Sequence, residues 1–354
     1  MGSSGRKCKN KDFAEAPDRI GLWRGNHIEG TIEVMKNFDR QVWDKRIQIL
    51  DGGILQGAGW SDFQESINRP VLRESGSNWA WQGFVRASRG LKYLIVPYGP
   101  LVHSNASEAI QSVLTQSRAA GCDFVRIEPR GTISLTEIKS HGGRQIGEIQ
   151  PQHTFVLNLA PSEEELRKNL QSGHRNRINT TAKRGITIRQ VRDMSPMDDF
   201  LRLMADTAAH AHIVNHPDWY YRSMAEVLVG EGIASFYVSE VAGQVASVSL
   251  VYDWGDTRSY AHTGNSQALN REYKVAVSAG WQMILDAKSA GLTKFDFWGA
   301  APDDNPAHKW AGITSFKKAF GGELISTLGS WDIPLKKHKY NAYHFYRKLR
   351  GRNA

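Results

Sequence analysis

Two neighbouring stretches decide the fold: Phe295-Asp-Phe-Trp-Gly299, and Gly312-Ile-Thr-Ser-Phe-Lys-Lys-Ala-Phe-Gly-Gly-Glu-Leu324. The first is a short apolar run with one acidic residue that ends in glycine, a pattern typical of a buried strand entering a turn. The second predicts a short basic helix over 314–320, closed by a Gly-Gly pair where a helix C-cap needs a positive φ. Phe316 and Phe320 lie four residues apart and share one helix face, so they are expected to anchor this helix. A lysine pair therefore follows closely after a buried strand.

The rest of the chain alternates short β-type runs with helical stretches from about Thr31 onward, as mixed α/β domains do. Ala242-Gly243 between two apolar runs predicts a hairpin, and Ser162 with Glu165 predicts a helix that starts with a capping box. The strands are expected to pair largely antiparallel. The predicted strands are 80–87, 91–96, 124–128, 154–159, 186–191, 233–241, 244–252, 258–264 and 295–299. The other predicted helices are 108–120, 196–211 and 275–290.

The composition is that of a globular protein, because 40% of the residues are hydrophobic and 23% are charged. No apolar run approaches the roughly 18 residues that a membrane-spanning helix needs. The N-terminal segment has no apolar core behind its charges, so it is not expected to act as a secretory signal. Cys8 and Cys122 are the only cysteines and lie far apart, which favours a reducing cytoplasm over a disulfide-linked exterior.

Positive charge is concentrated in two segments. Residues 166–192 contain eight Lys/Arg and residues 336–352 contain seven, and neither segment contains an acidic residue. Since the whole chain carries a net charge of only +9, the basicity is local, as a polyanion-binding surface requires. A solvated helix face and a charged tail are the alternative explanation. No helix-turn-helix, zinc finger or ribonucleoprotein motif occurs, so DNA is not expected and RNA would be held by its backbone.

The chain resembles the Fem family of aminoacyl transferases over roughly residues 40–335, with the matching segments in the family's order. These enzymes extend the peptide stem of bacterial cell-wall precursors and take the amino acid from charged tRNA. Gly57 and Glu128 stand where Ser and Asp are usual in the family, and Asn179 and Thr181 stand where Arg and Ala are common. The matching segments are 54–60, 93–102, 125–129, 154–185 and the two stretches quoted above.

The resemblance implies an α/β fold of two tandem GNAT-like domains, without the long coiled-coil insertion that some family members carry. It also implies the domain boundaries. A loose lead-in spans 1–30, the first domain spans 31–153, and the second spans 154–330. The C-terminal tail 331–354 is expected to return to the first domain.

The reaction that the resemblance implies is attack by a stem-peptide amine on the ester carbonyl of aminoacyl-tRNA. An ester is already activated, so no covalent enzyme nucleophile is needed. Lys317 occupies the lysine position of the family's Phe-Lys motif and is expected to stabilise the developing negative charge. Glu128, at a strand end, is the candidate for orienting the amine or taking its proton. The plainer alternatives are that Lys317 is an exposed surface lysine and that Glu128 caps a strand.

The implied partners are aminoacyl-tRNA and a peptidoglycan precursor, either UDP-linked or lipid-linked at the inner membrane face. A cytoplasmic location is expected, with peripheral membrane contact if the precursor is lipid-linked, and no cofactor is expected. The candidate substrate-binding residues are Gln56, Trp60, Tyr98, Arg175 and Phe316. The candidate tRNA-binding residues are Arg177, Lys183, Arg184, Lys318, Lys336 and Lys337.

Three other functions stay open. An acyl-CoA-dependent N-acyltransferase would need a glycine-bearing loop for pyrophosphate, which the segment 270–275 lacks. A tRNA-dependent transferase acting on a small metabolite, or a non-catalytic RNA-binding module, would carry many of the same residues. His210, His212 and His216 are too loosely spaced to predict a metal site, and no Gly-x-Ser-x-Gly elbow indicates a serine nucleophile.

Overall fold

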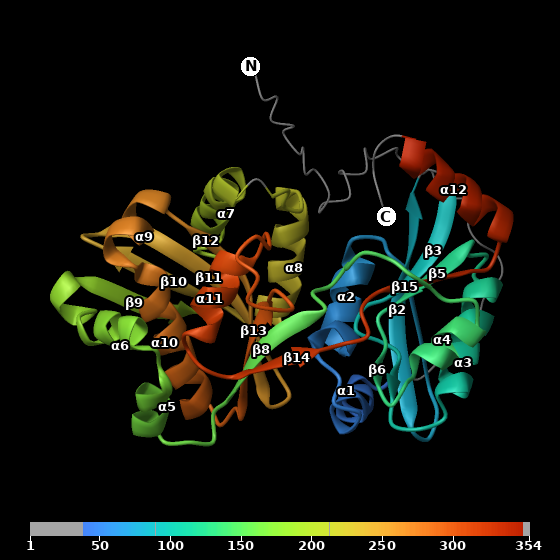
Figure 1. Cartoon of the computed structure of the whole chain (residues 1–354), viewed down its shortest axis with the longest axis horizontal. Helices are drawn as coiled ribbons and strands as arrows, with labels where there is room; N and C mark the ends of the chain where they lie inside the picture. The colour runs from blue at the N-terminus through green and yellow to red at the C-terminus, as the bar shows by residue number, and fades with distance from the viewer. Residues whose placement is uncertain (1–37, 89, 212, 350–354) are drawn as a thin grey trace, which may run out of the picture.

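The computed structural model describes residues 38–88, 90–211 and 213–349. Within these ranges the chain forms two halves that lie side by side, each a mixed β-sheet with helices packed on it (Figure 1). The predicted lead-in 1–30, Cys8 and His212 fall outside the described residues.

The first half begins with helical segments and continues into an eight-stranded sheet. The helical segments are α1 (Arg40–Ile49), the 3-10 turn η1 (Ile54–Gln56), α2 (Ala58–Ser66), α3 (Ala106–Ala119) and α4 (Leu135–Ser140). The strands are β1 (Val71–Ser75), β2 (Trp79–Ser88), β3 (Leu91–Val96), β4 (Leu101–Val102), β5 (Phe124–Ile127), β6 (Arg130–Gly131), β7 (Arg144–Gln145) and β15 (Trp331–Pro334). Their order is β6-β4-β2-β3-β5-β15-β7, with β1 paired to β2.

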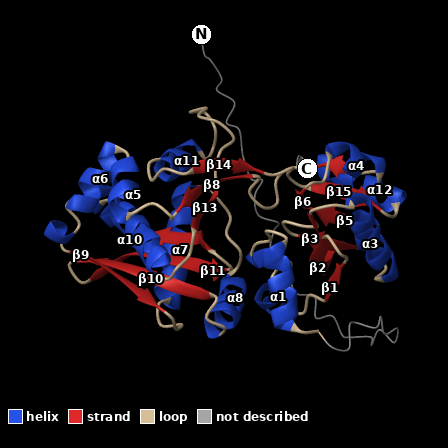
Figure 2. Ribbon diagram, turned by 90° about the horizontal axis from the view of Figure 1, so that it is seen from below, coloured by secondary structure: helices blue, strands red, loops and turns tan. Residues whose placement is uncertain are grey.

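The second half holds a seven-stranded sheet in the order β14-β8-β13-β12-β11-β10-β9. Its strands are β8 (His153–Asn158), β9 (Ile186–Val191), β10 (Ala234–Val241), β11 (Gln244–Trp254), β12 (Thr257–Asn265), β13 (Lys294–Gly299) and β14 (Glu323–Ser326). Its helical segments are α5 (Glu163–Asn169), α6 (Ser172–Asn179), η2 (Ala182–Arg184), α7 (Met197–Ala211), α8 (Asp218–Gly230), α9 (Gln267–Tyr273), α10 (Val275–Ser289) and α11 (Ala311–Lys318). Figure 2 shows α10 over one face of this sheet, and α7 and α8 pack on the other.

Each sheet contains a parallel strand pair joined by a helix. In the first sheet β3 and β5 pair in parallel through α3, and in the second β12 and β13 pair through α10. The β12–β13 pairing stops after three residue pairs, ending at Ser259 and Asp296, so the two strands separate beyond that point. In open α/β sheets, ligands bind where neighbouring strands diverge at their carboxyl ends. The residues that follow β5 and end β13 are therefore placed to form a site.

Two segments cross between the halves and are hydrogen-bonded to each other. The first connects β7 to β8 and the second connects β14 to β15. The Ile146 N–H donates to the Ser330 carbonyl at 3.0 Å, and the Thr327 N–H donates to the Gln152 carbonyl at 2.9 Å. Figure 1 shows the orange-red segment leaving β14 and entering the first sheet as β15, after which α12 (Lys337–Leu349) packs on the same half.

The halves also share one hydrophobic core. Phe63 of α2 packs edge-on against Tyr220 of α8, with ring centroids 5.0 Å apart. Leu55, Leu228 and Phe236 are at most 2% exposed in the same cluster. The junction between the halves is therefore dry and closely packed rather than a loose linker.

The local predictions are largely confirmed. Strands 91–96 and 186–191 have the predicted bounds, and most other predicted elements differ from the structure by one or two residues at each end. Ser162 and Glu165 form the predicted capping box. The Gly321-Gly322 pair has φ values of +94° and +96°, as the predicted helix end requires. In the part of the chain that the structure describes, no helix is both long and apolar enough to cross a bilayer.

Candidate functional site

Lys317 lies at the end of α11 with its side chain turned inward against the end of β13. Only 5% of the residue is exposed, and its Nζ donates to the carbonyl oxygens of Trp298 at 3.2 Å and Gly299 at 2.6 Å. Burial lowers the pKa of Lys317 to about 8, although the nearby Asp296 opposes the shift. An ammonium group has three N–H donors, so two hold the backbone and one is left for another group. The alternative of an exposed surface lysine is therefore wrong.

The backbone that receives Lys317 is held in an uncommon conformation. Trp298 has φ +59°, which is unusual for a bulky side chain. The Trp298 N–H donates to Asp296 Oδ1 at 2.7 Å, and the same oxygen accepts the Thr154 hydroxyl. Strained conformations persist where surrounding contacts hold them, and they concentrate at functional sites.

A second aromatic residue with positive φ meets Trp298 from the first half. Tyr98 has φ +48° in the turn between β3 and β4, next to the cis Gly99–Pro100 bond. Its hydroxyl donates to the Pro151 carbonyl at 2.8 Å, and its ring packs edge-on against Trp298 with centroids 5.9 Å apart. The ends of β3 and β13 thus meet through one aromatic pair.

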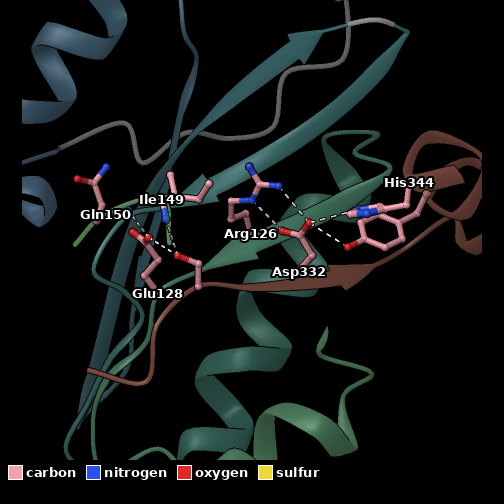
Figure 3. A network of polar contacts seen from close by, with 8 residues as sticks. Arg126, Glu128, Ile149, Gln150, Asp332 and His344 are labelled. Atoms are coloured by element: carbon pink, nitrogen blue, oxygen red, sulfur yellow. Dashed lines mark hydrogen bonds and ion pairs between the residues drawn. The ribbon is translucent and has the colours of Figure 1, made fainter. Parts of the chain in front are cut away.

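Glu128 directly follows β5 and is almost completely buried. Its Oε1 accepts the Gln150 N–H at 2.7 Å (Figure 3) and the Ser330 hydroxyl at 2.7 Å. Its Oε2 accepts the Tyr98 N–H at 3.3 Å. The carboxylate therefore joins the Tyr98 turn to both crossing segments. Burial raises the pKa of Glu128 above its usual value, against the opposing effect of these hydrogen bonds.

Replacing Glu128 with alanine is expected to lower the free energy of unfolding by about 3 kcal/mol, because buried donors lose their acceptor. Urea unfolding at neutral pH measures this loss, and Ser330→Ala, which removes one donor, should cost about 1 kcal/mol. The raised pKa adds a separate dependence on pH. Protonation of Glu128 favours the fold, so the stability that comes from the pKa shift is present below pH 4.5 and is lost as pH rises through the folded-state pKa. In the Glu128→Gln variant, the free energy of unfolding should lack this dependence on pH. An unchanged stability of the alanine variant would contradict the role.

Gln56 and Trp60 lie in the first half beneath the Tyr98 turn. The Gln56 side chain is fully buried, donating to the carbonyls of Gln82 at 2.9 Å and Pro97 at 2.7 Å, and so it supports the turn from below. Trp60 is 8% exposed and packs in the shared core. In this structure neither side chain presents a free surface to a substrate.

Arg175 belongs to α6 and Phe316 belongs to α11, and the two helices touch through His174. Arg175 donates to the carbonyls of Lys168 at 3.2 Å and Leu170 at 2.9 Å, so it caps the end of α5. Phe316 is half-buried, and His174 of α6 contacts it and Phe320 at centroid distances of 5.5 and 4.6 Å. Sequence reasoning missed His174, although it lies inside the basic segment that drew attention to Arg175.

The candidate tRNA-binding residues divide between the two ends of the molecule. Lys183 and Arg184 are exposed, Arg177 is half-buried, and all three belong to α6 and the turn after it. Lys336 and Lys337 stand at the start of α12, and Figures 1 and 2 place α6 and α12 at opposite ends. The two basic segments therefore do not form one continuous surface.

Some of these charges already have partners. Lys318 pairs with Asp304 at 2.6 Å, and Lys336 pairs with Asp123 at 2.9 Å. Both lysines are about half exposed, so these ion pairs are readily exchanged for contacts with another anion.

A hollow of about 300 Å³ opens between α7 and α8, and sequence reasoning did not predict it. Tyr221 lines it and connects to Trp298 through His262 and Tyr252, with successive ring centroids 5.4, 6.2 and 6.5 Å apart. Burial lowers the pKa of His262 to about 3, so this ring is neutral. Among the described residues no three His, Cys, Asp or Glu side chains come close enough to hold a metal ion.

The start of α10 offers no cradle for pyrophosphate. The helix α9 occupies most of the segment before it, and Asn270 Oδ1 accepts the Ala276 N–H at 3.1 Å. One first-turn N–H group, which in a phosphate-binding helix would face the phosphate, thus already donates a hydrogen bond to a side chain of this chain.

Comparison with known proteins identifies the family. The model of the FemAB family matches residues 139–250 and 239–348, which together exceed half of the chain. The chain belongs to the FemAB family. Curated relatives of this FemAB chain include the aminoacyltransferase FemA of Staphylococcus epidermidis, 28% identical over 101 residues, and that of Staphylococcus aureus, 29% identical over 103 residues. These matches cover 28% and 29% of this chain and 22% of either relative.

Solved structures share the fold over most of the chain. The crystal structure of FemX superposes with a TM-score of 0.75 at 17% identity, covering 86% of this FemAB chain and 98% of FemX. The L-PGS structure from Bacillus licheniformis gives a TM-score of 0.54 at 12% identity, covering 84% and 92% of the two chains. The tandem α/β fold predicted from the sequence is confirmed.

Proposed function

We propose that this chain transfers an amino acid from aminoacyl-tRNA to the stem-peptide amine of a peptidoglycan precursor. The observation that carries the proposal is the Lys317 amine, buried at the end of β13 with two donors tied to the backbone and one unused. Membership of the FemAB family and the FemA relatives support the aminoacyl donor.

The reaction needs alignment, charge stabilisation and a path for one proton. The amine nitrogen attacks the ester carbonyl carbon, a C–N bond forms, and the C–O bond to the tRNA ribose breaks. The third N–H of Lys317 stabilises the negative oxygen of the tetrahedral intermediate or the departing ribose oxygen. The amine's proton ends on the ribose hydroxyl, and a carboxylate such as Glu128 would relay it only if its hydrogen bonds opened.

Binding of tRNA is assigned to α6, η2 and the lysines at the start of α12. These two groups lie at opposite ends of the described structure, so they are not parts of one surface. Of the two, α6 and η2 are better supported as the tRNA-binding part, because α6 contacts the helix that carries Lys317. The Gln171 N–H donates to the Ala319 carbonyl at 3.0 Å, which fixes the two helices together. A cytoplasmic location follows from the tRNA donor and belongs to the same proposal.

The test incubates purified protein with UDP-linked muramyl pentapeptide and a pool of charged tRNAs, and reads the product mass. The expected product is heavier by one amino-acid residue and disappears after RNase treatment. A parallel tube contains acetyl-CoA without tRNA, and acetylation there alone would overturn the proposal. If neither tube yields product, the lipid-linked precursor replaces the acceptor, and failure with that acceptor too would reject cell-wall transfer.

A further inference from the structure

Arg130 follows Glu128 by two residues, and its guanidinium lies over the face of the Tyr98 ring. Its guanidinium carbon is 3.9 Å from the ring centroid, which is close for such a contact. The Arg130 N–H donates to the Pro100 carbonyl at 3.0 Å, and β6 pairs in parallel with β4 at this position. The backbone hydrogen bond and the contact with the Tyr98 ring therefore hold the Arg130 side chain at the turn that carries Tyr98.

Within the described ranges, the donors of this guanidinium have no hydrogen-bond partner. Among the described residues no carboxylate or carbonyl accepts a hydrogen bond from the Arg130 side chain, and its Nε is buried without a partner. The charges of Glu148 and Asp296 are close enough to raise the pKa of the Tyr98 hydroxyl, yet among the described residues neither carboxylate forms an ion pair with Arg130. By contrast, Arg126 of β5 donates two hydrogen bonds to Asp332.

The position of Arg130 relates it to Lys317. Tyr98 touches Arg130 on one side and Trp298 on another, and the Trp298 carbonyl accepts a hydrogen bond from Lys317. Two cationic side chains thus flank one aromatic pair at the junction. A guanidinium stacked on a ring directs its N–H groups outward in its own plane, as a fork for two oxygens.

We propose that Arg130 binds a paired anionic oxygen group of the acceptor substrate, a carboxylate or a phosphate, and so positions the acceptor beside Lys317. The proposal rests on the transfer reaction proposed above for the identity of the acceptor. An arginine is required because lysine offers neither the planar stack on Tyr98 nor two parallel donors.

The test compares the wild type with Arg130→Gln and Arg130→Lys by calorimetry in the absence of tRNA. The probes are muramyl pentapeptide without the nucleotide, the same peptide as its C-terminal amide, and UDP alone. Loss of a charge-assisted, two-oxygen contact should weaken binding about tenfold or more in the glutamine variant, with a smaller loss in the lysine variant. A loss confined to the free-acid peptide assigns the carboxylate, and a loss for UDP assigns the phosphate.

A matched control variant and a kinetic measurement distinguish two roles of Arg130. One role is binding of the anionic group, and the other is packing against Tyr98 without binding. Arg118→Gln removes an exposed arginine of the same half and should leave all three affinities unchanged. In the transfer assay, Arg130→Gln should raise KM for the acceptor while KM for charged tRNA stays constant. A lower Tm with unchanged affinities would overturn the proposal and leave Arg130 as a packing residue.

Failure of this inference is distinguishable from failure of the transfer reaction. If Arg130→Gln transfers an amino acid with the wild-type KM for the acceptor, the role of Arg130 is rejected and the reaction stands. If no transfer occurs with any acceptor but Arg130→Gln weakens probe binding, the anion site stands and the reaction is rejected.

Discussion

Replacing Lys317 with methionine is expected to reduce aminoacyl transfer by about 10²–10³-fold, the usual cost of removing one preorganised donor to a developing oxyanion. Methionine has a similar length and suits a buried position, so the variant should fold. Lys317→Gln keeps an NH2 group that can donate to the Trp298 or Gly299 carbonyl, and it provides a second folded variant. The measurement is the single-turnover rate with saturating charged tRNA, together with circular dichroism.

The neighbouring lysine provides the comparison. Lys318 is exposed and paired with Asp304, so Lys318→Met should alter KM for tRNA without changing the rate at saturation. A folded Lys317→Met variant that transfers at the wild-type rate would remove Lys317 from the reaction. It would also favour the interpretation that the chain only uses this lysine to fasten α11 to β13.

Lys317 also predicts an unusual dependence of stability on pH. Its pKa falls from 10.5 to about 8 on folding, so between these values the unfolded chain binds the extra proton. The free energy of unfolding should therefore rise as pH increases from about 8 to 10.5, by about 3 kcal/mol from this group. Denaturant unfolding of the wild type and of Lys317→Met isolates the effect, since the variant should lack this rise.

The largest expected loss of stability comes from Asp332→Ala, at about 3–5 kcal/mol, because it removes the carboxylate that accepts two hydrogen bonds from the buried Arg126. The Arg126 and Asp332 side chains are 4% and 0% exposed, and their closest atoms are 2.8 Å apart (Figure 3). Asp332 also accepts the Tyr340 hydroxyl at 3.0 Å, so the same carboxylate fastens α12. Hydrogen exchange should show β15 and α12 losing protection before the second sheet does.

Two comparisons test the prediction for Asp332→Ala. The exposed pair of Arg202 and Asp199 has side chains 54% and 42% exposed, so Asp199→Ala should change stability by less than about 1 kcal/mol. Replacing Arg126 and Asp332 together with Met and Leu should restore much of the loss, since both buried charges of the pair are then removed. Equal losses from the buried and the exposed pair would contradict the argument.

Local structure was predictable because local residues determine it. The Gly321-Gly322 helix end, the Ser162 capping box and the Ala242-Gly243 hairpin each follow from side chains within a few positions. The site was not predictable in the same way. Tyr98 and Trp298 meet although about 200 residues separate them, and Glu128 pairs with Ser330 across 202 positions. No periodic pattern in either segment indicates its partner.

The resemblance to a family singled out Lys317 and Glu128 as candidate site residues, but their surroundings could be seen only in the fold. Sequence alone treats Lys317 as a solvated lysine, because most lysines are exposed. Its burial follows from the turn at Trp298, which no composition or spacing indicates. The anion-binding arrangement at Arg130 was missed for a related reason, since a single arginine after a proline carries no motif.

The return of residues 331–334 to the first sheet has a consequence for synthesis on the ribosome. β15 lies between β5 and β7, so the first sheet is incomplete until residue 334 has left the exit tunnel. Every strand of the second sheet is made before β15, so that sheet can close first. A nascent chain of which only the residues up to 330 have left the tunnel could hold a complete second sheet beside an incomplete first sheet, with Arg126 lacking the Asp332 carboxylate. The half that is translated first is thus the half that folds last.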